Sequence, residues 1–506
     1  MTGRPPPYPP PPRPAEVVPR LVAAGIPSRI GKGDTSLWPN AARPGWVGAA
    51  RAARPLVGEI EGLRDQLRLA GQVRVVLAAA GGVGVAAEAL CAADPRLVVL
   101  DSTDPVQVAD ALAGELAATV LVVSAPPGED TTGVELVRDA VHRAFRAEGL
   151  DPDAQTVVVT PPGGPLQQEA GGAVVVLGPA DVDGPWAALT AFALVPAGLA
   201  GADVGAVLAD AAAAAPGFAA DSDDNPALEL GALLAGAPVV ALADDGTPAL
   251  AEWAGQLVAG GLGKDGHGPL VVPVEGPDAP EWAGGAALAL SIGDVPGAAG
   301  GTAGSPATQI LLWQHAVAVA AHLLGVDPTD RPDAAAARPA SGGEQPAFVE
   351  GGIEVHAGPW LPAGTDTVAG ALRALVGSVG THLTVHAYLD RVDDASAAVL
   401  RPELARRTGL PTVFGWAPRW LPGSGQRDKG GPVGALVCQL TGAADDTDAD
   451  PGADPGTGTD PLAEHQIAQA RGDAVALATR GTIVLRLHFT DRVAGLVTLA
   501  RAVQQL

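Results

Sequence analysis

Short apolar runs alternate with alanine-rich, helix-like stretches from residue 72 onward. The first series of runs occupies 73–77, 97–100, 119–123, 156–159 and 173–177 and is rich in β-branched residues. Runs that are apolar on both faces are typical of parallel strands covered by helices on each side. The pattern therefore predicts a doubly wound α/β domain.

A second series of runs follows the polar loop 221–224 and repeats this design. Its members are 238–242, 270–274, 287–292, 383–389, 434–440 and 482–488. Between the two series lies an alanine-rich stretch, 186–215, which predicts a long helical bridge with Pro216 and Gly217 as its stop. We therefore expect two domains, 25–218 and 219–506.

Three further segments need separate interpretation. Residues 5–14 are nearly all proline, so 1–24 is predicted to be a disordered tail of polyproline II character, with a docking role as the alternative. Residues 442–460 predict a solvated acidic loop, which lacks the spacing and terminal Glu of a calcium-binding EF-hand. Residues 184–202 are long enough to span a bilayer, but their prolines favour a buried helix.

Composition narrows the class of partners. The 506 residues carry 56 acidic and 31 basic side chains, a net charge of −25, which argues against nucleic-acid binding. The N-terminus has no apolar signal region, so we expect a cytoplasmic protein with no membrane association. Cys91 and Cys438 lie in apolar surroundings and predict buried thiols.

Two predicted strand ends carry candidate ligand-binding residues. Gly81 and Gly82 follow the first strand and precede a helix-like stretch, a geometry that lets backbone N–H groups hold a phosphate. The third strand ends at Ser124, with Thr131 and Thr132 close behind it. Ligands usually sit at the carboxyl ends of parallel strands, so these hydroxyls are candidates as well.

The chain resembles glucose-6-phosphate isomerases, most closely the isomerase half of bacterial transaldolase–isomerase fusions. The segments that carry the resemblance occur in the same order and are IGKGDTSLW (30–38), GG (81–82), DSTDP (101–105), NPALELG (225–231), GKDGHG (263–268), LGVDPTDRP (324–332), FGWAPR (414–419) and SGQRDKGGP (424–432).

This resemblance implies an α/β fold with two sugar-isomerase domains, each a flavodoxin-like parallel sheet sandwiched by helices. It also implies interconversion of glucose 6-phosphate and fructose 6-phosphate, in glycolysis and gluconeogenesis, with no metal and no cofactor. The partner would be the sugar phosphate, and a homodimer is possible. That chemistry moves a proton between C1 and C2 and needs a carboxylate base and a nearby cation.

Three positions depart from the family pattern. The family's catalytic Glu corresponds to Gly260, and its enediolate-stabilising Arg corresponds to Pro185. The lysine of its phosphate loop is missing after Ser124, and Glu129 and Asp130 add negative charge there.

The matching positions that keep functional side chains give the candidate site. Lys429 is the candidate substrate cation, with Asp265 and His267 as candidates for the lost base. Candidate substrate-binding residues are Gly81, Gly82, Ser124, Thr131, Thr132, Lys264 and Gln426. His315 and His322 lie on an apolar stretch and are interpreted as packed core histidines.

Two hypotheses follow. The first is an active isomerase in which Asp265, His267 or another acid has replaced the base. The second is a catalytically impaired descendant that binds a phosphosugar or serves as a partner subunit.

Overall fold

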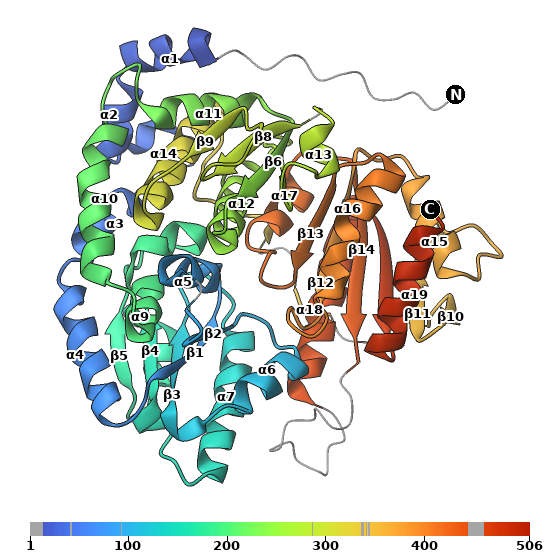
Figure 1. Ribbon diagram of the computed structural model, residues 1–506, viewed down its shortest axis with the longest axis horizontal. Helices are drawn as coiled ribbons and strands as arrows, with labels where there is room; N and C mark the ends of the chain where they lie inside the picture. The colour runs from blue at the N-terminus through green and yellow to red at the C-terminus, as the bar shows by residue number, and fades with distance from the viewer. Residues whose placement is uncertain are drawn as a thin grey trace.

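The computed structural model describes residues 14–40, 43–92, 94–285, 287–334, 338–340, 342, 345–443 and 460–506. Three β-sheets and the helices around them make up this part of the chain (Figure 1). The first sheet lies in the N-terminal region, and the other two lie in the region after residue 219.

The first sheet is parallel throughout and has the strand order β2-β1-β3-β4-β5. Its strands are β1 (Arg74–Ala79), β2 (Leu97–Leu100), β3 (Thr119–Ser124), β4 (Thr156–Thr160) and β5 (Val174–Leu177). This is the flavodoxin-like order, and all five strands coincide with the first series of apolar runs. The predicted fold class is confirmed.

The two-faced apolar character of these runs has a direct structural cause. Val75 and Leu77 of β1 pack into the core that contains α5 (Val83–Cys91) and α9 (Ala191–Ala200). Val76 and Ala78 point to the opposite face, into the core that contains α6 (Pro105–Leu112) and α7 (Thr132–Ala147). Because side chains alternate along a strand, helices on both faces require apolar residues at every position.

The second series of runs is divided between two sheets, where one was expected. A four-stranded parallel sheet has the order β7-β6-β8-β9. A six-stranded sheet has the order β10-β11-β15-β14-β12-β13, in which β10 and β11 are antiparallel to their neighbours and the other four strands are parallel. The strands are β6 (Val239–Asp244), β7 (Leu270–Pro273), β8 (Leu288–Ile292), β9 (Gly300–Thr302), β10 (Phe348–Glu350), β11 (Ile353–Ala357), β12 (His382–Tyr388), β13 (Thr412–Trp416), β14 (Ala435–Gly442) and β15 (Ile483–Phe489).

Helices join the first two sheets into one hydrophobic core. A single cluster of buried side chains contains residues of β1 and α5 together with residues of β6, α12 (Pro248–Leu262) and α14 (Pro306–Leu324). The proposed boundary at residue 218 therefore does not separate two cores. The remaining helices are α1 (Pro14–Ala23), α2 (Ile26–Gly31), α3 (Trp46–Ala52), α4 (Leu56–Leu69), α8 (Pro165–Gln168), α10 (Val204–Phe218), α11 (Pro226–Gly236), α12 (Pro248–Leu262), α13 (Pro280–Ala283), α14 (Pro306–Leu324), α15 (Val368–Val376), α16 (Ser396–Thr408), α17 (Ser424–Gly430), α18 (Pro461–Thr479) and α19 (Arg492–Gln504), with 3₁₀ turns η1 (Thr35–Leu37), η2 (Leu116–Ala118), η3 (Asp153–Gln155) and η4 (Gly184–Leu189).

The segment 184–202 is largely buried, as predicted, since all residues of η4 and α9 are buried.

A different helix, α14, has the length and composition of a membrane span. Among the described residues it is the one helix long and apolar enough to cross a membrane, and 78% of its apolar window is buried inside the protein. This burial is typical of a core helix.

Two expectations about local structure need correction. Part of the expected N-terminal tail, Pro14–Ala23, is helix α1, because Val17, Val18 and Leu21 form an apolar face that packs into the core. The expected helical bridge is broken between α9 and α10, where Asp203 accepts a hydrogen bond from the Ala206 N–H and starts a new helix. The predicted stop at Pro216 and Gly217 is wrong, because α10 continues through both residues to Phe218. Residues 1–13 of the tail and residues 444–459 of the acidic loop lie outside the described residues.

Candidate active site

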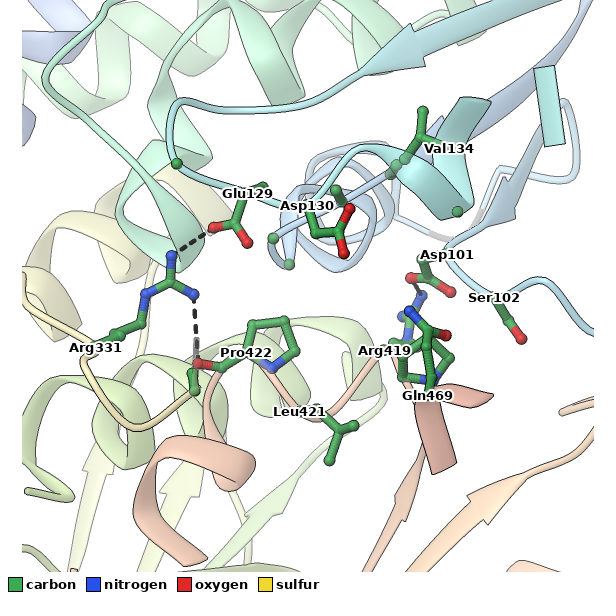
Figure 2. A pocket seen from close by; sticks show the side chains of 18 of the residues that line it. Asp101, Ser102, Glu129, Asp130, Val134, Arg331, Arg419, Leu421, Pro422 and Gln469 are labelled. Carbon is green, nitrogen blue, oxygen red and sulfur yellow. Dashed lines mark hydrogen bonds and ion pairs between the residues drawn. The ribbon is translucent and has the colours of Figure 1, made fainter. Parts of the chain in front are cut away.

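A cavity of about 720 Å³ lies at the carboxyl edge of the first sheet. One wall comes from the ends of β1 and β2 and from the loop after β3. The facing wall comes from the end of β12, the loop after β13, α17 and α18. Ligand sites in open α/β sheets occupy this position, and the volume falls in the usual range for small-molecule sites. The cavity is therefore the candidate site (Figure 2).

The glycine turn after β1 forms part of this cavity and is covered by a carboxylate. Gly81 and Gly82 have φ values of +70° and +82° and lead into the N-terminus of α5. A β-carbon at position 81 would lie 2.6 Å from the carboxyl carbon of Glu129, so that side chain packs directly on the glycine. Glu129 also accepts a 2.5 Å hydrogen bond from Arg331, which reaches across from the loop after α14 (Figure 2).

A second carboxylate occupies the N-terminus of α7. Asp130 accepts hydrogen bonds from the Thr132 N–H at 3.0 Å and from the Thr132 hydroxyl at 2.7 Å. The Thr131 hydroxyl donates to Glu135 instead. Burial acts to raise the pKa of Asp130, but the Thr132 hydrogen bonds hold it below its usual value. Glu129 and Asp130 thus place two carboxylates beside the glycine turn and the N-terminus of α7.

Arg419 joins three separate elements behind the cavity. Its guanidinium pairs with Glu88 of α5, with Asp101 after β2 at 2.7 Å and with Glu252 of α12 at 2.8 Å. Burial acts to lower the pKa of Arg419, but attraction to the three carboxylates holds it well above its usual range. The positive charge is therefore fully committed within the protein.

Lys429 lines the cavity and belongs to a buried chain of charges. Its ammonium pairs with Asp473 of α18, and both side chains are 1% exposed. Behind them, His386 lies 3.4 Å from Asp473 and 3.1 Å from Asp428. Burial alone would lower the pKa of His386, but its contacts with Asp428 and Asp473 raise it to about 9. The cluster of Asp428, His386, Asp473 and Lys429 holds two negative and two positive charges and is neutral as a whole.

Several neutral polar atoms in the cavity wall lack protein partners. The Thr103 hydroxyl, the Tyr388 hydroxyl and the Gln469 carbonyl oxygen make no hydrogen bond to any described residue. Thr103 is 3% exposed and Tyr388 is fully buried. Each of these three atoms has almost no solvent-accessible area, so it lies behind the surface of the cavity wall and does not face the cavity.

Three of the ten predicted site residues line the cavity: Gly81, Gly82 and Lys429. Thr131 and Thr132 lie beside it on the Asp130 loop, with their hydroxyls engaged as described.

The other five are structural or lie on the surface. Ser124 donates to the Phe192 carbonyl at 2.9 Å in the core. Gln426 bonds both to the backbone of 333–334 and to the Gly263 carbonyl. Lys264 donates to the carbonyls of Asp327 and Asp330, and burial lowers its pKa to about 8. Asp265 and His267 are exposed in a turn outside the cavity lining, where Asp265, Gly266 and Gly268 have positive φ values.

Little room for a side chain remains at Gly260, the residue that the family resemblance aligns with a catalytic Glu. Gly260 is buried in α12. A β-carbon there would lie 3.3 Å from the Pro422 carbonyl oxygen and 3.3 Å from the Gly423 Cα, and 3.6 Å from the Arg331 side chain. A β-carbon at position 260 would therefore be tight against the backbone of the loop that follows β13, which would have to shift by a few tenths of an ångström.

Sequence reasoning missed Arg331, Arg419, Asp473 and His386 as cavity or cluster residues. Arg331 and Arg419 lie inside segments that carry the family resemblance, and this was a usable signal. Asp473 and His386 lie on α18 and β12, where no motif marks them. Among the residues that the structure describes, no group of three or more His, Cys, Asp or Glu side chains could hold a metal ion.

Cys438 and His315 are buried as predicted, whereas Cys91 and His322 are only half-buried, with a His322 ring nitrogen 2.9 Å from the Leu37 carbonyl oxygen. Both cysteines are unpaired, and burial raises the pKa of each thiol to about 12. His315 packs edge-on against Trp46 in the core, and burial lowers its pKa to about 4.

Comparison with known proteins gives partial matches. No protein-family model matches the chain. A "Probable glucose-6-phosphate isomerase" from Haloarcula marismortui is 35% identical over 198 residues, which are 37% of this chain and 45% of that protein. A protein of the same name from Natronomonas pharaonis is 34% identical over 201 residues, 37% of this chain and 46% of that protein. The match thus spans less than half the length of these curated relatives.

Solved structures with a similar arrangement were also found. A glucose-6-phosphate isomerase from Chlamydia trachomatis matches with a TM-score of 0.49 and 16% identity, over 55% of this chain and 71% of that one. A hypothetical protein from Thermus thermophilus matches with a TM-score of 0.45 and 16% identity, over 97% of this chain and 89% of that one.

Proposed function

We propose that the chain, which is similar to probable glucose-6-phosphate isomerases over part of its length, binds a carbohydrate in the cavity without efficient isomerisation. The observation that carries this proposal is the closed position 260. Residue 260 has no side chain that could act as a base, and a β-carbon there would lie only 3.3 Å from the backbone of the Pro422-Gly423 loop.

The remaining carboxylates of the cavity support the same conclusion. A base must hold a free oxygen within hydrogen-bond reach of the proton that it removes. Five of the six acidic side chains in the lining are engaged: Asp101 with Arg419, Glu129 with Arg331, Asp130 with Thr132, Asp183 with Arg43 and Asp473 with Lys429. The sixth, Asp330, is exposed.

The expected loss of rate is large. A positioned base contributes roughly 10²–10⁴-fold, and preorganised stabilisation of the enediolate contributes on the order of 10²–10³-fold. With Gly260 and Pro185 in place of the family's Glu and Arg, interconversion of glucose 6-phosphate and fructose 6-phosphate should fall by about 10⁴-fold or more.

The test is a coupled assay in which purified protein receives fructose 6-phosphate and a dehydrogenase reports glucose 6-phosphate. We expect no rate above that of heat-denatured protein. Turnover comparable to that of an intact isomerase assayed in parallel would refute the proposal.

Retained isomerisation is the second candidate, and one observation favours it. Glu129 and Arg331 bring a carboxylate and a guanidinium together in the lining of the cavity. If turnover is found, Glu129→Gln should abolish it, while Asp265→Asn and His267→Ala should leave it unchanged because both side chains lie outside the cavity lining. A role as partner subunit, or as a homodimer, would show in the mass of the purified complex.

A further inference from the structure

We propose that Glu129 competes with the ligand of the cavity: its carboxylate occupies the place on Arg331 that an anionic group of a bound carbohydrate takes. The inference rests on the proposed function, because it requires a carbohydrate to bind in the cavity. It adds that this carbohydrate is anionic, such as a sugar phosphate, and that one residue of the protein limits its affinity.

Arg331 is the fixed member of this pair. Figure 2 shows its guanidinium between Glu129, to which it donates at 2.5 Å, and the Pro422 carbonyl, to which it donates at 3.4 Å. The guanidinium also lies against Gly184, where a β-carbon would be 2.7 Å from its central carbon. The Cδ atom of Arg331 lies 3.6 Å from the β-carbon position of Gly260. The contacts with Pro422, Gly184 and Gly260 do not depend on Glu129, so they hold Arg331 in place when the carboxylate leaves.

Glu129 is the member that can withdraw. Among the described residues, Arg331 donates the one hydrogen bond that its carboxylate accepts. The preceding residue, Gly128, is exposed and has a φ value of +80°, and a β-carbon there would have no atom within 4 Å. Glycine adopts a wide range of backbone angles. A rotation at Gly128 therefore meets no packed neighbour there and moves Glu129 off Arg331.

The pair is accessible from the cavity. The side chains of Arg331 and Glu129 line the cavity and are 12% and 14% exposed, whereas those of Lys429 and Asp473 are 1% exposed. A molecule in the cavity can therefore touch the first pair directly. A planar guanidinium binds carboxylates and phosphates in the same two-pronged geometry. The Glu129 carboxylate thus resembles, in charge and shape, the group that replaces it.

The exchange of one anion for another keeps the charges paired. Withdrawal of Glu129 alone would leave the largely buried Arg331 without its hydrogen-bonded counter-charge, and a buried unpaired charge is costly. An anionic ligand supplies that counter-charge, and an uncharged sugar does not. Because an anionic ligand must first separate Arg331 from Glu129, its apparent affinity is reduced by the fraction of molecules in which the pair is closed. Weakening this contact should therefore raise the affinity for an anionic sugar alone.

The experiment is isothermal titration of the full chain with fructose 6-phosphate and, separately, with fructose, at one ionic strength. Glu129→Gln should bind fructose 6-phosphate at least about fivefold more tightly than the unmodified protein does, and its response to fructose should be the same. If the unmodified protein binds too weakly to titrate, this variant should bring binding into the measurable range. Arg331→Gln should weaken the binding of fructose 6-phosphate, and Glu129→Gln added to it should give no tightening.

Two matched variants separate the contact from the charge. Asp130→Asn removes one negative charge from the same loop, but Asp130 accepts hydrogen bonds from Thr132 and none from Arg331, so it should tighten binding less than Glu129→Gln does. Glu129→Asp keeps the charge and shortens the side chain by one methylene, which breaks the contact with Arg331. This variant should also bind fructose 6-phosphate more tightly. A damaged fold lowers affinity, so tighter binding cannot come from misfolding.

Unchanged or weaker binding of fructose 6-phosphate by Glu129→Gln would overturn the proposal, because a carboxylate that only stabilises the fold gives that result. Equal tightening by Asp130→Asn, or no tightening by Glu129→Asp, would overturn it as well, because either would indicate general repulsion. The proposed function fails differently: through efficient turnover of fructose 6-phosphate, or through the absence of binding of both compounds to every variant.

Discussion

The buried, charged imidazole of His386 leads to a quantitative prediction of how the free energy of unfolding depends on pH. Its pKa is raised from the ordinary value of 6.5 to about 9: burial acts against the charge, and Asp428 and Asp473 outweigh it. A group whose pKa is higher in the folded than in the unfolded protein stabilises the folded state. This stabilisation is complete at pH values below the pKa of the unfolded protein, and it is lost as the pH rises through the pKa of the folded protein. At roughly 1.4 kcal/mol for each pH unit, His386 should contribute about 3 kcal/mol at pH 6 that is lost by about pH 9.

The assay is urea unfolding at several pH values between 6 and 9, with a matched variant. Burial lowers the pKa of Lys264 to about 8, so this residue makes the free energy of unfolding rise with pH above pH 8. This effect opposes that of His386, so the pH profile of the unmodified protein alone does not measure the contribution of His386. His386→Gln combined with Asp428→Asn removes one positive and one negative charge and leaves the Lys429–Asp473 pair intact.

The difference between the two proteins isolates the imidazolium. The free energy of unfolding of the unmodified protein, minus that of the variant, should fall by about 3 kcal/mol between pH 6 and pH 9. Parallel pH profiles would refute the reasoning, because they would mean that His386 gains no proton affinity on folding.

Three further predictions concern single positions. Arg419→Met should lower the free energy of unfolding by about 3–5 kcal/mol, measured by urea titration, because it leaves Glu88, Asp101 and Glu252 without their shared cation. Gly81→Ala should destabilise by roughly 1–3 kcal/mol, since φ is +70° and the new methyl group would meet Glu129; a midpoint equal to that of the unmodified protein would contradict this. Gly260→Glu should lower the thermal midpoint and restore no isomerase activity in the coupled assay, because the Pro422-Gly423 backbone fills the space.

The strands of the first sheet could be predicted because their burial leaves a local signal. Helices on both faces demand apolar residues at successive positions, and the runs show this directly. Strand β9, by contrast, is the three-residue segment Gly300–Thr302, whose composition of two glycines and a threonine predicts a turn. Its pairing with β8 supplies the missing stability, and no local pattern reports such pairing.

The candidate site was harder to predict because its important contacts join distant parts of the chain. Glu129 and Arg331 meet across 202 positions, and nothing near either residue indicates the other. Lys264 shows the reverse failure: it matches a family motif, yet it serves to hold the carbonyls of the loop that carries Arg331. The family segments in the sequence indicated which parts of the chain lie near the cavity. The chemical role of each residue depended on its tertiary contacts.

The Arg419 guanidinium has a consequence for how the chain can be divided. It comes from the region after residue 219 and pairs with Glu88 and Asp101 of the region before it. A cut at residue 218 would leave Glu88 and Asp101 without this cation, whereas Arg419 would keep Glu252, and it would expose the two halves of one shared core. The two fragments would therefore fold properly only when present together, as complementing pieces of one molecule.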